Sequence, residues 1–172
     1  MIKILNIPVE TMSNQVIITA DKILPENVTQ NVRSNSNGAV ITFLGTTRNE
    51  TKGRKVLRLE YEAYEPMASQ KISEIISEVQ EKFSVSDISI CHRIGTIEIG
   101  EISLVVSVSS PHRKDSFNAC QYVVDRIKEI VPIWKKEIFL DGEEWVESIY
   151  IYRLENLIEF LIFCHPFIKI YF

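Results

Sequence analysis

The chain has 172 residues, of which 45% are hydrophobic and 24% are charged, the balance of a folded domain with a substantial core. Its formal net charge of -4 argues against a general nucleic-acid binder, which normally carries a basic surface. Any anion-binding site is therefore expected to be a local cluster of Arg, Lys or His side chains.

The three cysteines, Cys91, Cys120 and Cys164, are widely spaced and form no CxxC pair. This pattern predicts reduced thiols in a reducing compartment, with neither a disulfide framework nor a zinc site. The first ten residues contain no long apolar run followed by a small-residue cleavage site, so secretion is not expected. We therefore expect a cytosolic protein that carries no metal and no other cofactor.

Strands are predicted where apolar residues alternate or run together, and helices where they recur every three or four positions. In the first half of the chain this predicts strands at Asn14–Thr19, Ala39–Thr46 and Val56–Tyr64, a weak helix at Asp21–Val32 and a polar loop at Asn49–Arg54. The third strand alternates, which places Leu57, Leu59, Tyr61 and Ala63 on one side and Arg58, Glu60 and Glu62 on the other.

An amphipathic helix is predicted to begin at Pro66, with an apolar face formed by Ile72, Ile75, Ile76, Val79 and Phe83. Strands at Asp87–Ile94 and Ile102–Val108 follow, joined by a hairpin connection at Gly95–Gly100. A second helix is predicted from about Pro111 to Ile130, with an apolar stripe of Phe117, Cys120, Val124, Ile127 and Val131. A strand at Ile133–Leu140 comes next.

Helices mixed in this way with antiparallel strands indicate an α+β fold, in which an antiparallel sheet carries helices packed on one face. No repeat or linker divides residues 1–147, which are predicted to form one domain. Residues 148–172 are predicted to be a separate, atypical hydrophobic tail. Its charged residues are Arg153, Glu155, Glu159 and Lys169, and they interrupt it too often for a membrane span.

The segment Ser109–Arg113 is the strongest candidate for an anion site. His112 and Arg113 are expected in the first turn of the second helix, where free backbone N–H groups and the helix dipole favour an anion. Arginine also offers the paired donors that suit phosphate or carboxylate. Taken alone, however, a basic pair at a helix start is more often a surface feature.

Two lysines flank Pro132 at the end of the same helix. Lys128 lies in the last turn, where it can stabilise the C-terminus of the helix. Lys135 lies in the following strand and is expected to point to the face opposite Trp134 and Lys136. Composition alone favours an ordinary structural role for both lysines.

Arg48 follows the strand that contains Gly45, and strand ends are where pockets usually form. His92 alternates with buried positions and is interpreted as a structural histidine. Cys120 lies on the apolar stripe of the second helix and is interpreted as a core residue. The sequence contains no Ser-His-Asp order, no P-loop and no Rossmann glycine pattern.

Five segments together resemble the large, catalytic subunit of molybdopterin synthase. They are Gly38–Asn49, Leu59–Ala68, His92–Gly95, Val108–Arg113 and Lys128–Phe139, in that family's order and approximate spacing. The resemblance implies a hammerhead-type α+β fold and a homodimer of large subunits within a heterotetramer. Each large subunit would bind one small, ubiquitin-like subunit whose C-terminal Gly-Gly carries a thiocarboxylate.

The implied reaction transfers two sulfurs from that thiocarboxylate to cyclic pyranopterin monophosphate, which forms the dithiolene of molybdopterin in molybdenum cofactor biosynthesis. The family's pocket residues correspond to Phe43, Arg48, His112 and Arg113 for the substrate and to Lys128 and Lys135 for catalysis. Lys128 is the first choice for acid or base, supported by Lys135. Because the sulfur arrives on the partner, no catalytic cysteine is needed.

The tail departs from the family pattern, since Ile149 stands where a basic residue is expected. This departure favours an alternative function, a non-catalytic binding module for a ubiquitin-like partner or an anionic ligand. A second alternative is an RNA-binding α+β domain, which would need aromatic and basic residues on one sheet face. The acidic balance, with Glu60 and Glu62 on the expected outer face of a strand, argues against it.

Overall fold

A computed structural model describes residues 14–146 of the chain. The elements are β1 (Gln15–Thr19), α1 (Pro25–Gln30), β2 (Ala39–Thr46), β3 (Glu50–Thr51), β4 (Arg54–Ala63), α2 (Glu65–Lys82), β5 (Ile88–Arg93), β6 (Gly95–Glu98), β7 (Ile102–Ser110), α3 (Arg113–Ile130), β8 (Ile133–Phe139) and β9 (Gly142–Val146). The predicted α+β class is confirmed. The hydrophobic tail predicted at 148–172 lies outside the described residues, and between residues 14 and 146 no helix has the length and apolarity to cross a membrane.

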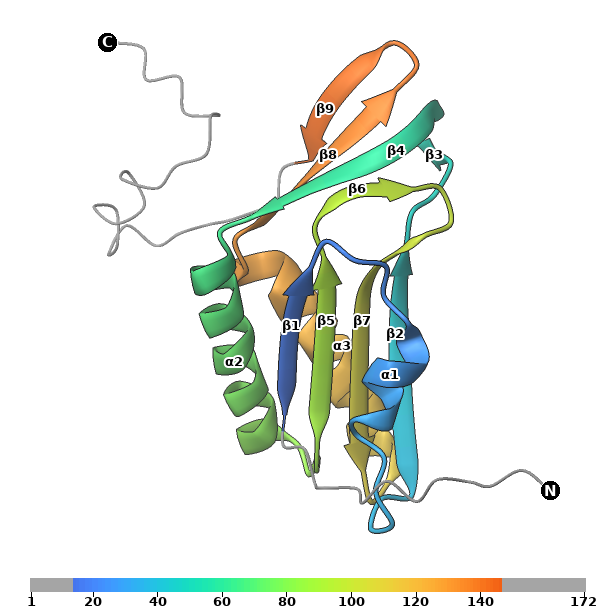
Figure 1. Ribbon diagram of the computed structural model, residues 1–172. Helices are drawn as coiled ribbons and strands as arrows, with labels where there is room; N and C mark the ends of the chain where they lie inside the picture. The colour runs from blue at the N-terminus through green and yellow to red at the C-terminus, as the bar shows by residue number, and fades with distance from the viewer. Residues whose placement is uncertain (1–13, 147–172) are drawn as a thin grey trace, which may run out of the picture.

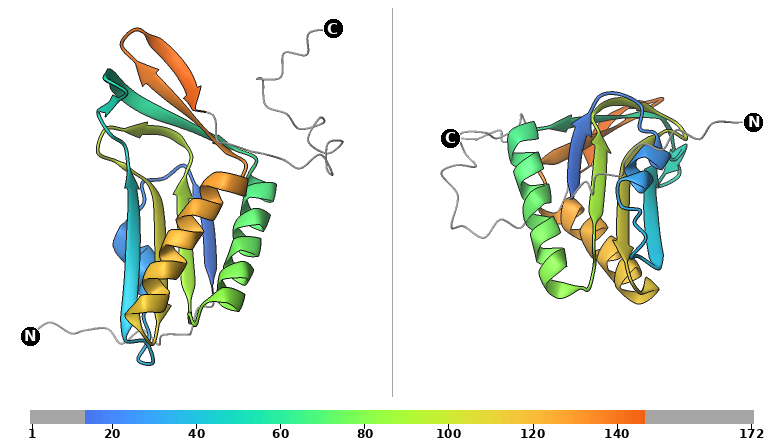
Figure 2. Two further views of the ribbon diagram at one scale, coloured as in Figure 1. Left: turned by 180° about the vertical axis from the view of Figure 1, so that it is seen from behind. Right: turned by 60° about the horizontal axis from the view of Figure 1, so that its bottom comes forward.

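The first sheet has the strand order β1-β5-β7-β2. Its pairs β5–β7 and β7–β2 are antiparallel, whereas β1 runs parallel to β5. The long helices α2 and α3 lie side by side on one face, and the short helix α1 lies on the other (Figures 1 and 2). The predicted packing of helices on one face therefore holds for the two long helices.

The main core lies between the first sheet and the two long helices. Helix α2 buries Ala68, Ile72, Ile75, Ile76 and Val79, as its three-and-four spacing predicts. These side chains pack against inward-facing residues of β5 and β7, among them Ile88, Ile90, Leu104, Val106 and Val108. On the other face of the sheet, Cys91 and Val105 form a smaller cluster with Val28 of α1.

The second sheet has the order β3-β4-β8-β9, with β6 also paired to β4. It lies across one end of the first sheet, above the ends of β5, β7 and α3 in the view of Figure 1. Helix α3 runs along the first sheet and ends at Val131 and Pro132, since proline cannot continue a helix. Strand β8 of the second sheet begins directly after these two residues. The chain thus joins the two sheets at the C-terminal end of α3.

Three short strands lie where no strand was predicted. Strand β3 lies inside the predicted polar loop, β6 inside the predicted hairpin connection, and β9 after the last predicted strand. The first two have only two and four residues, and most of β9 is exposed, so none shows a clear alternation of apolar residues.

Two side-chain positions differ from the prediction. Leu57 was expected on the apolar side of its strand but is exposed, because the register of β4 against β8 shifts between Val56 and Arg58 and leaves Leu57 as the extra residue of a bulge. Phe117 was expected in the apolar stripe of α3 but is 58% exposed. The small residues Ser116 and Ala119 face the sheet instead and leave Phe117 on the flank of the helix.

Candidate active site

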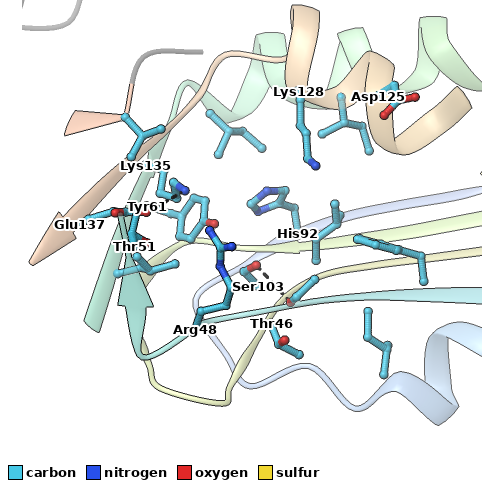
Figure 3. Close-up of a pocket in the computed structure, with 18 of the residues that line it drawn as sticks. Thr46, Arg48, Thr51, Tyr61, His92, Ser103, Asp125, Lys128, Lys135 and Glu137 are labelled. Carbon is cyan, nitrogen blue, oxygen red and sulfur yellow. Dashed lines mark hydrogen bonds and ion pairs between the residues drawn. The ribbon is translucent and has the colours of Figure 1, made fainter. Parts of the chain in front are cut away.

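A cavity of about 720 Å³ lies between the end of the first sheet, the inner face of the second sheet and the last turns of α3. Its wall comes from β2, β4, β5, β7, α3 and β8, so elements from most of the described chain contribute to it. Figure 3 shows that Arg48, Lys128 and Lys135 all point into this space. The fold therefore brings Arg48 and Lys128, which are 80 positions apart in the sequence, to one site.

Four of the six residues predicted for the site line this cavity: Phe43, Arg48, Lys128 and Lys135. Phe43 is the fifth of the eight residues of β2, and Arg48 lies two residues after the end of that strand. Lys128 lies in the last turn of α3, and Lys135 is the third residue of β8. Arg48 and Lys128 therefore stand at the ends of elements, whereas Phe43 and Lys135 project from within strands whose faces line the cavity.

Lys135 is held by a buried carboxylate. Its Nζ lies 3.0 Å from Oε1 of Glu137, whose side chain is only 5% exposed. Because the two residues are two apart in β8, they project from the same face of the strand into the cavity. Lys136 projects to the opposite face, where it pairs with Glu60 at 3.1 Å, so the predicted orientation of Lys135 relative to Lys136 is confirmed.

Arg48 and Lys128 are exposed at the cavity and pair with no carboxylate among residues 14–146. Two carboxylates of α3 also line the cavity: Asp125, about one helical turn before Lys128, and Glu129, the residue after Lys128. In Figure 3 Asp125 points away from the region where the three cations meet. The cavity thus offers two basic side chains that are available to an anionic ligand.

Uncharged polar groups occupy the part of the wall nearest the first sheet. Tyr61 of β4, His92 of β5 and Ser103 of β7 are among them. Burial raises the pKa of Tyr61, and a hydrogen bond with Ser103 partly offsets that effect. Burial also lowers the pKa of His92 to about 4, which keeps the imidazole neutral at neutral pH.

The thiols within the described residues take no part in the cavity. Cys91 and Cys120 are free and buried, and burial raises the pKa of each to about 11. The interpretation of Cys120 as a core residue is confirmed, since it belongs to the main cluster between α3 and the sheet. No cysteine thiol among residues 14–146 therefore lines the cavity.

His112 and Arg113 do not lie at this cavity within one chain. His112 is the N-cap of α3 and Arg113 its first residue, and both are exposed. Lys128 is fifteen residues further along the helix, which corresponds to about 22 Å at a rise of about 1.5 Å per residue. The helix therefore separates the predicted basic residues into two groups at its two ends.

The lining residues that were not predicted for the site include Tyr61, His92, Ser103 and Glu137. Glu137 could have been found, because a carboxylate two residues after Lys135 in a strand shares its face. Tyr61 was correctly expected on the apolar side of its strand, and that side turns out to face the cavity. Nothing in the local pattern of Ser103 distinguishes it from a core position.

The fold and the cavity together define a class: an α+β protein whose two sheets enclose a pocket lined by three cations and three carboxylates, in which Arg48 and Lys128 pair with no carboxylate among the described residues. The family model described as "MoaE protein" matches residues 18–130. A relative from Bacillus subtilis, the "Molybdopterin synthase catalytic subunit", is 50% identical over 129 residues, which cover 75% of this chain and 82% of the relative.

Solved structures agree with this match. The crystal structure of molybdopterin synthase from Staphylococcus aureus superposes with a TM-score of 0.72 at 46% identity, covering 77% of this chain and 96% of that chain. A MoaE protein from Burkholderia ambifaria superposes with a TM-score of 0.69 at 28% identity, covering 81% and 92%. The chain belongs to the MoaE protein family, and the resemblance seen in its sequence is confirmed.

Proposed function

We propose that this chain is the catalytic subunit of a molybdopterin synthase, which transfers sulfur from a thiocarboxylated small subunit to cyclic pyranopterin monophosphate. The observation that carries the proposal is the convergence of Arg48, Lys128 and Lys135 on one cavity from three separate elements. The relatives at about 50% identity bear the name of this catalytic subunit, and a catalytic subunit implies a second subunit as partner.

Both reactants are anionic, and the cavity supplies cations for them. A cyclic phosphate suits the guanidinium of Arg48, which offers paired N–H donors and has no competing carboxylate among the described residues. A thiocarboxylate suits an ammonium group such as that of Lys128. Phe43 offers an apolar surface beside them for the pterin ring.

Lys128 is the residue that we assign to acid–base chemistry. The thiocarboxylate sulfur attacks an electrophilic carbon of the pterin substrate, an oxygen leaving group departs, and a thioester links the two molecules. Water then adds to the thioester carbonyl, and the resulting oxyanion collapses with cleavage of the acyl C–S bond, which leaves the sulfur on the pterin and a carboxylate on the small subunit. An ammonium at this point stabilises the oxyanion and can donate a proton to the leaving group. Lys135 supports this by adding positive charge, and Glu137 holds its Nζ in place at 3.0 Å.

His112 and Arg113 enter this scheme through a second copy of the chain. They lie at the far end of α3 from Lys128, so they reach a cavity of this kind only across an interface between two subunits. We propose a homodimer in which the basic start of α3 of one copy completes the anion site of the other. With one small subunit bound to each copy, the assembly is a heterotetramer.

The cytosol is the compartment that we propose for this enzyme. Both cysteines in residues 14–146 are free thiols, which suits a reducing environment.

Reconstitution tests the function. The purified full chain is mixed with a thiocarboxylated small subunit and cyclic pyranopterin monophosphate, and molybdopterin is measured. The wild type is expected to form product, Lys128→Ala to lose at least about a hundredfold in rate, and the control Lys136→Ala to stay within about twofold. Binding of the small subunit without any product from the wild type would contradict the proposal and leave a binding module.

A further inference from the structure

His92 is a buried histidine with one ring nitrogen already occupied. Its side chain is the last of the row Ile88, Ile90, His92 on the helix-covered face of β5, where the core gives way to the cavity. The residue is 5% exposed, and its ring stands edge-on to Tyr61 with the ring centroids 5.3 Å apart. Figure 3 shows the imidazole pointing into the same space as Tyr61 and Lys128.

The hydrogen bond of Nδ1 fixes the tautomer. Nδ1 lies 2.9 Å from the backbone carbonyl oxygen of Arg93, and because a carbonyl oxygen only accepts, Nδ1 must carry the proton and donate it. In the neutral ring Nε2 is then an acceptor with a free lone pair. Burial keeps the ring neutral by lowering its pKa to about 4. Within the described part of the chain Nε2 has no hydrogen-bond partner.

This acceptor is uncharged, unlike the three carboxylates that line the cavity, and it cannot donate, unlike the other polar side chains there. The three cations of the cavity only donate, and the carboxylate of Glu137 is already paired with Lys135. The hydroxyls of Tyr61 and Ser103 can donate as well as accept. A neutral group that only accepts selects an N–H or O–H on its ligand and disfavours a carbonyl oxygen at the same place.

We propose that Nε2 of His92 accepts a hydrogen bond from a ring N–H or amino group of the pterin substrate and so fixes how the ring lies in the cavity. The inference rests on the proposed function, which supplies the pterin. A pterin is a flat, nitrogen-rich ring with several N–H donors, and the wall around His92 includes the aromatic rings of Phe43 and Tyr61. His92 is thus a substrate-binding residue, in addition to its structural bond with Arg93.

Two substitutions separate these two roles. The amide nitrogen of His92→Asn lies near the place of Nδ1 and can still donate to the Arg93 carbonyl, but no atom takes the place of Nε2. The longer side chain of His92→Gln brings an amide oxygen to about the place of Nε2 and restores an acceptor. If His92 has only a structural role, His92→Asn should impair the enzyme less than His92→Gln. If Nε2 binds the substrate, His92→Gln should impair it less.

The experiment measures the affinity of the full chain for cyclic pyranopterin monophosphate by titration, and its KM and kcat with the thiocarboxylated small subunit. We expect His92→Asn to weaken pterin binding and raise KM about tenfold with kcat changed less than about threefold, and His92→Gln to stay within about threefold of the wild type. The affinity for the small subunit should not change. Nitrogen-resolved NMR of the imidazole should show Nδ1 protonated and Nε2 unprotonated, with the Nε2 signal shifting when the pterin is added.

The outcomes distinguish failure of the inference from failure of the proposed function. Wild-type activity with equal pterin affinity in His92→Asn overturns the role of His92 and leaves the function intact. Weakened binding of the small subunit, with pterin affinity unchanged, assigns Nε2 to the peptide tail and also overturns the inference. A wild type that neither binds the pterin nor forms product overturns both.

Discussion

Replacing Lys135 by alanine separates what this residue does for stability from what it does for catalysis. The substitution leaves the carboxylate of Glu137 buried without the ammonium group that lies 3.0 Å from it. Breaking a fully buried ion pair costs about 3–5 kcal/mol, but the side chain of Lys135 is 28% exposed, so solvent screens part of the interaction. We expect the free energy of unfolding to fall by about 2 kcal/mol and Tm by about 6 °C.

A second substitution removes the unpaired negative charge of Glu137. In Lys135→Ala with Glu137→Gln the buried group is neutral, so more than half of the lost stability should return. The rate of molybdopterin formation should not return with it, because the cation at the cavity is still missing. Both variants are measured by urea unfolding at one fixed protein concentration and by the reconstituted assay.

Lys136→Ala is the matched control, since it removes the next lysine of the same strand from the opposite face. Its partner Glu60 is 26% exposed, so solvent screens the pair, and we expect only a small loss of stability with activity within about twofold. If the double variant recovered activity together with stability, Lys135 would have only a structural role, and the reasoning would be wrong.

Three further predictions concern other parts of the molecule. Mixing Lys128→Ala chains with Arg113→Ala chains should restore about a quarter of wild-type activity, since half of the dimers are mixed and each has one intact pocket; activity no higher than that of either variant alone would place each site within one chain. Gly38→Ala puts a Cβ 2.6 Å from the carbonyl oxygen of Pro111 and should lower the free energy of unfolding by about 2 kcal/mol in urea, while an unchanged midpoint would contradict this close approach. His92 has a lowered pKa in the folded state, so the unfolded chain binds more protons between about pH 4 and pH 6.5 and stability falls as the pH falls through that window, by up to about 3 kcal/mol. His92→Gln should lose that part of the pH dependence in unfolding measurements, and an identical dependence in both proteins would count against a buried neutral imidazole.

The helices and long strands could be predicted because burial imposes a period on the sequence. In α2 the core positions follow one another at three and four residues, and the structure buries all but Phe83 of the expected apolar face. Leu57 shows the limit of such reasoning, because a bulge shifts the register by one residue without any mark in the local sequence. Phe117 shows another, since the helix approaches the sheet through its small residues.

The candidate site was predictable only in part, and for a different reason. Local chemistry favoured a structural reading of both Lys128 and Lys135, and the resemblance to a family selected them. The predicted helix from about Pro111 to Ile130 already placed Arg113 in its first turn and Lys128 in its last turn, and the structure confirms this separation. His92 was interpreted as structural because a strand residue that faces a core and one that faces a cavity share the same alternation.

If this cavity directs sulfur from the small subunit to the pterin, the fate of the thiocarboxylate should show it. The mass of the thiocarboxylated small subunit is followed in a single turnover with the full chain, with and without cyclic pyranopterin monophosphate. We predict conversion of thiocarboxylate to carboxylate only when the pterin is present, slowed at least about a hundredfold in Lys128→Ala. Conversion that needs no pterin, or that proceeds equally fast in Lys128→Ala, would contradict this prediction.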